Sequence, residues 1–236
     1  MPIAAWILLM AAALISSVTE LPAQENAAPA QPDAASADTK ENQKDWKPLF
    51  SGKDLKDWKV TNFGGEGEVE VGPRGELIIH RGVDLSGITS RRKDLPTTNY
   101  EVEFEAQRAK GTDFFVGYTF PVGDSACSLV LGGWGGGVCG ISSLDFMDAS
   151  DNETTSYRDF TRGKWYKVRV RVTDSHVKAW LGKWNIADVE RALYKIDVRF
   201  EMEISKPMGF ATYQTVAKVR NARIRTLSAD EVDADD

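Results

Sequence analysis

The chain has 236 residues, of which 42% are apolar and 10% aromatic, which is enough for one core of ordinary size but not for two large domains. Twenty Gly, nine Pro and seven Trp disfavour a helical bundle and favour a β-rich domain with many turns. The net charge of −6 comes from the tails, because residues 1–45 hold six acids and two bases, residues 228–236 hold five acids and no base, and the part between holds 24 acids and 27 bases. No clustered basic face of the kind that binds nucleic acid is present, so we expect no nucleic-acid partner.

Residues 3–15 form an unbroken run of apolar and small side chains. This run is shorter than the roughly 20 residues of a spanning helix but suits the core of a signal peptide, and the small residues that follow place a cleavage site near Ala23. The pattern predicts an exported protein, periplasmic or extracellular, without an integral membrane span after cleavage. An uncleaved membrane anchor is the alternative.

The next segment, residues 24–45, contains six Ala, two Pro and many polar residues but no Val, Ile, Leu, Phe, Tyr or Trp. Such a segment cannot bury enough apolar surface to order itself, so it predicts a disordered linker. Residues 228–236 predict a solvated acidic tail. A single domain is therefore expected over residues 46–227.

Alternation of apolar and polar residues dominates this domain. In residues 100–107 apolar side chains alternate with glutamates, and in residues 166–172 they alternate with bases, as in half-buried antiparallel strands. We expect six of these apolar residues to be buried: Tyr100, Val102, Phe104, Tyr166, Val168 and Val170. Further strands are predicted at residues 69–71, 76–81, 114–120, 127–131, 138–141, 177–181, 209–213 and 217–226. Residues 186–196 fit a helix or an irregular strand. So many short strands predict an all-β sandwich of two antiparallel sheets.

The glutamates of the first strand allow two interpretations. Glycosidases with this architecture can place two catalytic carboxylates on one strand at the spacing of Glu101, Glu103 and Glu105. The strand at residues 166–172 offers Lys167, Arg169 and Arg171 in matching alternation, however. Opposite charges on neighbouring strands explain both rows, so we expect ion pairs rather than catalysis.

Cys127 and Cys139 are the only cysteines, and export would allow them to pair. A hairpin that closes over the glycine-rich residues 132–137 would place Leu131 opposite Val138 and thus Cys127 opposite residue 142. This register favours two buried thiols over a disulfide. The glycines also satisfy a G-x-G-x-x-G pattern, but no helix is expected after them, so a dinucleotide site is not predicted.

Metal and nucleophile motifs are weak. Only His80 and His176 are present, which excludes a three-histidine zinc site, and no G-x-S-x-G motif is found. No cofactor is evident. The loop with Asp148, Asp151 and Glu153 carries hard oxygen ligands that could hold Ca²⁺, although without the EF-hand spacing, and a plain solvated loop is the preferred interpretation.

A set of aromatic and polar residues suits a carbohydrate ligand, since sugar sites combine stacking surfaces with a few fixed polar groups. The set consists of Asp113, Tyr118, Trp134, Arg158 and Tyr213. We expect Asp113 to act as the base and Arg158 to stabilise an oxyanion, with Tyr118, Trp134 and Tyr213 binding substrate. A Trp134 that merely closes one end of the sandwich is the alternative.

Three segments resemble one known family. Residues 46–60 read WKPLFSGKDLKDWKV, residues 163–181 read GKWYKVRVRVTDSHVKAWL, and residues 218–227 read KVRNARIRTL. They resemble the opening segment, the late Trp-led strand pair and the closing strand of the 3-keto-disaccharide hydrolase domain family, also described as 3-keto-glucoside-1,2-lyase and 3-keto-2-hydroxy-glucal hydratase. In the middle, GTDFFVGY (111–118) and CSLVLGGW (127–134) depart from the family pattern. The second of these has no carboxylate, so the resemblance supplies no catalytic residue.

The resemblance implies a concanavalin A-like lectin/glucanase sandwich, or jelly roll, exported from a bacterium and acting on oxidised sugars. Two functions follow from it. The first is cleavage of a 3-keto-glycoside, in which a base removes the proton on C2 and the group on C1 leaves. The second is a catalytically silent carbohydrate-binding or adhesion module on the same fold.

Overall fold

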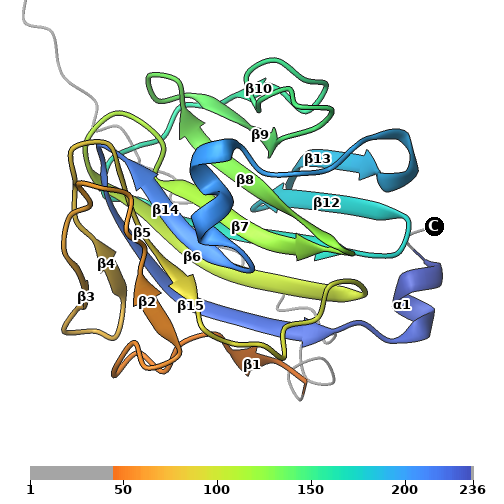
Figure 1. Ribbon diagram of the computed structural model, residues 1–236, viewed down its shortest axis with the longest axis horizontal. Coiled ribbons are helices and arrows are strands. Elements are labelled where there is room, and N and C mark those ends of the chain that lie inside the picture. The colour runs from red at the N-terminus through yellow and green to blue at the C-terminus, as the bar shows by residue number, and fades with distance from the viewer. Residues whose placement is uncertain (1–44, 235–236) are drawn as a thin grey trace, which may run out of the picture. The chain divides into compact units, whose positions relative to one another are not determined.

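The computed structural model describes residues 45–234. Two antiparallel sheets pack face to face and enclose one core, as the alternation predicts (Figure 1). The all-β sandwich is therefore confirmed. The signal peptide with its cleavage site near Ala23 and nearly all of the expected linker lie outside the described residues.

The first sheet, called sheet A, has eight strands. In spatial order they are β13 (Trp184–Glu190), β12 (His176–Leu181), β11 (Trp165–Val172), β6 (Tyr100–Lys110), β15 (Val216–Thr226), β4 (Leu77–Ile79) and β3 (Val69–Val71), with β1 (Lys47–Pro48) also paired to β15. Residues 186–196 were expected to form either a helix or an irregular strand, and residues 186–190 belong to strand β13. The chain then forms the short helix η2 (Arg191–Leu193).

The second sheet, called sheet B, has seven strands. They are β10 (Ser156–Tyr157), β9 (Val138–Ser142), β8 (Ser125–Gly133), β7 (Val116–Val122), β14 (Gly209–Tyr213), β5 (Leu85–Ser90) and β2 (Trp58–Val60). A 3-10 helix, η3 (Phe200–Ser205), packs against β5 and β14 and is drawn in front of β7 and β8 in Figure 1. Within the described part of the chain, no helix has both the length and the apolar character that a membrane crossing requires.

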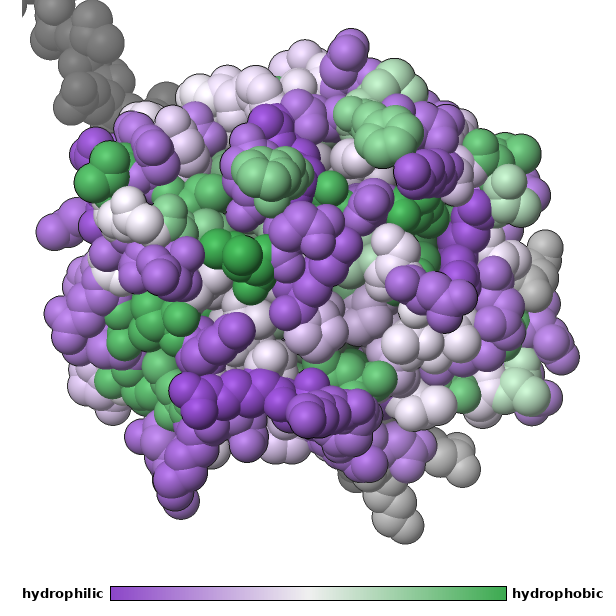
Figure 2. Space-filling model, viewed as in Figure 1, coloured by the Kyte–Doolittle hydropathy of each residue, from purple (hydrophilic) through white to green (hydrophobic). Residues whose placement is uncertain are grey.

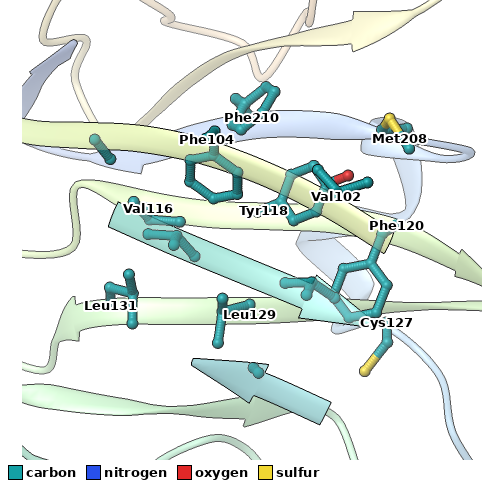
Figure 3. Packing of buried hydrophobic residues seen from close by; sticks show 14 of the residues in the cluster. Val102, Phe104, Val116, Tyr118, Phe120, Cys127, Leu129, Leu131, Met208 and Phe210 are labelled. Carbon is teal, nitrogen blue, oxygen red and sulfur yellow. The ribbon is translucent and has the colours of Figure 1, made fainter. Parts of the chain in front are cut away.

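The core lies between the sheets and contains the residues that the alternation assigns to it. Five of the six expected side chains are at most 1% exposed, and Tyr166 is half-buried. Their partners come from sheet B, where the rings of Tyr118 and Phe210 lie 5.1 Å from the Phe104 ring (Figure 3). Edge-on and tilted aromatic packing of this kind adds to the stability given by apolar burial.

In the central strands of sheet B, large side chains face the core and small side chains face outward. In β7 the inward positions are Val116, Tyr118, Phe120 and Val122, and the outward positions include Gly117 and Thr119. In β14 the ring of Phe210 points into the core, whereas Gly209 and Ala211 face outward. Because the outward side chains are so small, the outer face of sheet B leaves room above its centre.

The charged rows pair as the sequence predicts. Lys167, Arg169 and Arg171 on β11 lie opposite Glu105, Glu103 and Glu101 on β6. Salt bridges join Lys167 to Glu103 at 3.1 Å and Arg171 to Glu101 at 2.7 Å. The hypothesis that these glutamates form a structural ladder is thus supported over the catalytic one.

The acidic tail begins with an ordered helix whose residues remain partly or fully exposed to solvent. Ser228 caps the helix α1 (Ala229–Asp233) in a capping box with Glu231. The Glu231 carboxylate also lies 2.7 Å from the guanidinium of Arg225, and this hydrogen bond lowers the pKa of Glu231 to about 2. The Ser-x-x-Glu spacing was visible in the sequence and could have indicated this helix.

Candidate functional site

A pocket of about 810 Å³ lies on the outer face of sheet B, above its small side chains. Its floor includes Gly117 and Ser128, and its walls come from loops at the strand ends and from η3. Figure 2 shows this face, on which green apolar groups are interspersed with purple polar groups. The aromatic side chains of the lining are Phe63, Phe114, Trp134, Phe200 and Tyr213, and the carboxylates are Asp84, Asp113, Glu201 and Glu203.

Three of the five side chains expected at a sugar site line this pocket. Asp113 comes from the loop before β7, Trp134 from the loop after β8, and Tyr213 from the end of β14. These residues are up to 100 positions apart, and they meet because β7 lies between β8 and β14 in sheet B. The pocket thus combines stacking surface with a carboxylate.

Tyr118 does not belong to the site, and its expected contact with substrate was wrong. Its side chain is fully buried between the sheets, where its ring lies 4.8 Å from the ring of Phe210 (Figure 3). The physical reason is strand phase: Tyr118 is two residues from Val116 and from Phe120, so all three point into the core. Burial also raises the pKa of the Tyr118 phenol well above its usual range.

Arg158 also lies outside the pocket, so its expected role at an oxyanion is not supported. Its guanidinium stacks on the Trp184 ring, 3.5 Å from the ring centroid, and its backbone N–H donates to the Gly137 carbonyl. The side chain therefore covers an indole of β13. The cation that does line the pocket is Arg199, which precedes η3.

The Asp113 carboxylate is held in a fixed position. One oxygen accepts from the Phe114 N–H at 2.7 Å and the other from the Gly135 N–H at 3.0 Å. The second bond ties the loop before β7 to the glycine-rich turn that presents Trp134. Trp134 has a left-handed φ of 49° and is 46% exposed, so its ring is presented to solvent rather than packed inside.

Tyr213 stands beside two carboxylates. The pKa of the Tyr213 phenol is raised above its usual range, mainly by the negative charge of Asp84. Partial burial and the negative charge of Asp113 add to this shift. The phenol is protonated at neutral pH, as an ordinary tyrosine also is, and its raised pKa makes it a weaker acid. Its ring centroid lies 6.1 Å from that of Phe114, so the two rings form one aromatic wall.

The wall formed by η3 was not anticipated from the sequence. Arg199 pairs with Asp148 and also with Glu201, whose carboxylate lies 3.2 Å from the guanidinium. The hydrogen bond from Arg199 lowers the pKa of Glu201 and keeps that carboxylate ionised. Lys206 pairs with Glu203 at 2.9 Å. The one signal available was the row of acids and large apolar residues in FEMEIS, which is too short to have a clear period.

The floor holds one hydroxyl without a protein partner. The Ser128 and Thr119 hydroxyls lie 3.0 Å apart and hydrogen-bond to each other. Ser142 also lines the pocket and is 1% exposed, but its hydroxyl has no hydrogen-bond partner among the described residues. Buried hydroxyls normally find a partner, so Ser142 is available to a ligand group that reaches the floor.

The three carboxylates of the suggested calcium loop do not form a cluster. Asp148 pairs with Arg199, and Glu153 accepts a hydrogen bond from the Tyr194 hydroxyl. No group of three His, Cys, Asp or Glu side chains placed to hold a metal occurs within residues 45–234. The loop is organised instead by Asn152, whose side-chain amide donates to backbone carbonyls, including that of Asp148 at 2.8 Å.

The two cysteines are separate buried thiols, as the expected hairpin register favours. The register itself differs by one residue from the expected one, because the ladder shifts at the glycine-rich turn: Leu131 lies opposite Cys139 rather than Val138, and Ser142 lies opposite Ser128 rather than Cys127. Burial raises the pKa of the Cys139 thiol to about 11 and that of Cys127 further. Neither thiol is an activated nucleophile.

The sequence matches the profile of the 3-keto-alpha-glucoside-1,2-lyase-like domain family over residues 45–225. The chain belongs to this family. Among curated proteins no match is found. The family assignment agrees with the pocket of carboxylates and aromatic rings, and it identifies the domain as carbohydrate-active and glycosyl hydrolase-like.

Solved structures share the fold at low identity. A protein from Parabacteroides distasonis assigned as a glycosyl hydrolase is 15% identical with a TM-score of 0.50, over 78% of this chain and 94% of that one. The Crh5 transglycosylase in complex with NAG is 14% identical with a TM-score of 0.52, over 78% of this chain and 84% of that one. At these identities the likeness shows a common fold.

Proposed function

We propose that the domain cleaves 3-keto-glycosides by elimination, with the sugar bound in the pocket on sheet B. The observation that carries this proposal is the meeting of Asp113, Trp134 and Tyr213 in one hollow, in a chain of the 3-keto-alpha-glucoside-1,2-lyase-like family. The aromatic rings supply stacking surface for a sugar ring. The carboxylate and the phenol supply a base and an acid.

The reaction assigns one step to each group. The ketone at C3 acidifies the proton on C2, and the Asp113 carboxylate takes that proton. The electron pair forms a double bond between C1 and C2 as the bond from C1 to the leaving oxygen breaks, and the phenol of Tyr213, which is protonated at neutral pH, donates a proton to that oxygen. Water then adds across the double bond and gives the free 3-keto sugar.

Ser142 suits the developing charge on the C3 oxygen. Its hydroxyl lines the floor and has no partner among the described residues, so it is free to donate to a substrate oxygen. Arg199 is a poorer choice for this task, because Asp148 and Glu201 already neutralise its charge.

A binding module is the second candidate function. One observation favours it: both oxygens of Asp113 accept backbone hydrogen bonds, which gives this carboxylate a structural task in holding the Trp134 turn. In that case the aromatic wall would bind a sugar and no bond would break. The leader expected at residues 1–23 would place either function outside the cytoplasm.

The test separates proton abstraction from bond cleavage. The purified protein is incubated with a 3-keto disaccharide in D₂O, and NMR follows deuterium uptake at C2 and release of the free sugar. We expect Asp113→Asn to reduce both by at least about 100-fold. Tyr213→Phe should slow release while C2 exchange continues, because it removes only the proton donor.

Exposed residues outside the pocket provide matched controls: Asp151→Asn for the carboxylate and Tyr157→Phe for the phenol. Both should retain turnover. Full turnover by Asp113→Asn would remove Asp113 from the role of base. Binding without turnover of any 3-keto sugar by the unaltered protein would favour the binding module instead.

A further inference from the structure

The pocket has unequal charge at its two ends. At the η3 end, Arg199 and Lys206 neutralise Glu201 and Glu203. At the other end, neither Asp84 nor Asp113 forms a salt bridge with any residue that the structure describes, and both carboxylates act on the Tyr213 phenol. The negative charge of the pocket is therefore concentrated beside its aromatic wall.

The hydrogen-bond donors of these two carboxylates are uncharged, so they do not neutralise the negative charge. Asp84 accepts from the side-chain amide of Gln214 at 3.1 Å, and Asp113 accepts from backbone N–H groups. Asp113 also interacts electrostatically with Arg108, which is 7% exposed and donates to the carbonyls of the glycine-rich turn. The positive charge of Arg108 partly offsets the negative charge of Asp113 from inside the protein. Asp84, which forms no salt bridge with a described residue, is exposed at the rim of the pocket, so its charge acts more fully on a ligand.

Aromatic faces and unpaired carboxylates together are the recognition chemistry of an ammonium group. The Phe114 and Tyr213 rings lie 6.1 Å apart at an angle of 32°, and the Trp134 ring is presented by the neighbouring turn. Ring faces attract a cation through their quadrupole, and a carboxylate adds a direct Coulomb attraction. A sugar that carries a carboxylate or a sulfate would be repelled by the same two carboxylates.

A second feature of the pocket points to a polar ligand. The buried Ser142 hydroxyl faces the pocket from β9 without a partner among the described residues, so a ligand hydroxyl or carbonyl can complete its hydrogen bonding. The pocket thus offers a stacking wall, a negative end and a polar contact on the floor. This combination suits a sugar ring rather than a small inorganic cation.

We propose that the pocket prefers amino sugars: a glycan ring with a free, protonated amino group binds more tightly than its neutral counterpart, and acidic sugars are rejected. The inference rests on the proposed function only in placing the sugar in this pocket. It holds equally for an enzyme and for a binding module.

The experiment compares disaccharides of one linkage that differ in charge. Calorimetric titration of the protein at about pH 6, where an amine is protonated, uses the β-1,4-linked disaccharides of glucosamine, N-acetylglucosamine and glucose, and a glucose disaccharide oxidised to a uronic acid. We expect glucosamine to bind about five to ten times more tightly than glucose. The uronic acid should bind most weakly, and added salt should reduce the differences in affinity among the four sugars.

Asp84→Asn tests the source of the preference, because asparagine keeps one acceptor oxygen for Gln214 and removes the negative charge. The ratio of glucosamine to glucose affinity should fall at least about twofold in this variant. In the control Asp124→Asn, at an exposed turn after β7, the ratio should not change.

Equal affinities for the amino and neutral sugars would overturn the inference, as would a ratio of the two affinities that is unchanged in Asp84→Asn. If the charge preference is absent while the 3-keto disaccharide is still cleaved, only this inference fails. If no sugar binds and no 3-keto sugar is cleaved, the proposed function fails with it.

Discussion

At the scale of single residues, Arg108 explains how the Trp134 turn is held. This arginine is on β6, and its guanidinium reaches sheet B, where it donates to the Gly132 and Gly136 carbonyls at 3.1 and 2.8 Å. It also lies over the rings of Phe115 and Phe160. Gly136 has a φ of 125°, and a Cβ there would come within 2.5 Å of a backbone oxygen, so the turn needs glycine.

Replacing Arg108 should therefore destabilise the turn. Arg108→Met leaves two carbonyls without their donor, and we expect a loss of about 2–3 kcal/mol in the free energy of unfolding. The measurement is urea unfolding followed by circular dichroism. Lys110→Met, an exposed change on the same strand, is the control and should stay within about 0.5 kcal/mol. Equal stability of the two variants would contradict the assigned role.

At the scale of elements, β6 lies between two basic strands. Its glutamates face β11 on one side and β15 on the other, where Arg223 pairs with Glu103 at 2.7 Å and Arg225 with Glu101 at 3.3 Å. Cross-strand pairs at exposed positions contribute at most about 1 kcal/mol each. Glu101 differs from such pairs, because its side chain is only 3% exposed and contacts both Arg171 and Arg225.

The ladder should therefore contribute unequally along its length. Glu101→Gln removes the buried carboxylate that Arg171 and Arg225 share, while Arg225 keeps its ion pair with Glu231, and we expect the change to lower the free energy of unfolding by about 2–4 kcal/mol. Glu105→Gln, at a more exposed position, should cost less than about 1 kcal/mol. Urea unfolding of both variants at neutral pH measures the difference. If the two losses are equal, burial does not govern the strength of these pairs.

At the scale of the whole molecule, packing between the sheets stabilises the described domain without a covalent link. Its only two cysteines remain buried thiols, and a core of this extent does not need a disulfide. The two sheets also divide the tasks of the molecule. Sheet A presents a charged outer face held by ion pairs, and sheet B presents the hollow with the candidate site.

Reducing agent should therefore leave the stability of the protein unchanged. We expect the same melting temperature with and without dithiothreitol, because no bond is available to reduce. Alkylation of native protein by iodoacetamide should be slow for both thiols and complete only in denaturant, since burial raises the pKa of Cys139 to about 11. A drop in melting temperature on reduction would show a disulfide in solution.

The division between sequence and tertiary structure is clearest at Tyr118 and Arg158. The inward position of Tyr118 was readable from the alternation of Val116, Tyr118 and Phe120, and the aromatic character of the residue was given too much weight. The stacking of Arg158 on Trp184 was not readable, because β13 and the residue after β10 meet only in the folded sandwich. The wall at Arg199 and η3 is likewise a product of the fold.

By itself, the sequence determined most of the strands, the buried face of the two alternating strands at residues 100–107 and 166–172, and the pairing of the charged rows. These follow from a period of two residues along a strand and from the register of neighbouring strands, which are local properties. In contrast, β2, β5 and β10 were not predicted, and a disulfide was only disfavoured. Only the tertiary structure decided which distant residues form the pocket. Convergence depends on strand order and on the path of loops without a period, so it placed Asp113, Trp134 and Tyr213 together and left Tyr118 and Arg158 elsewhere.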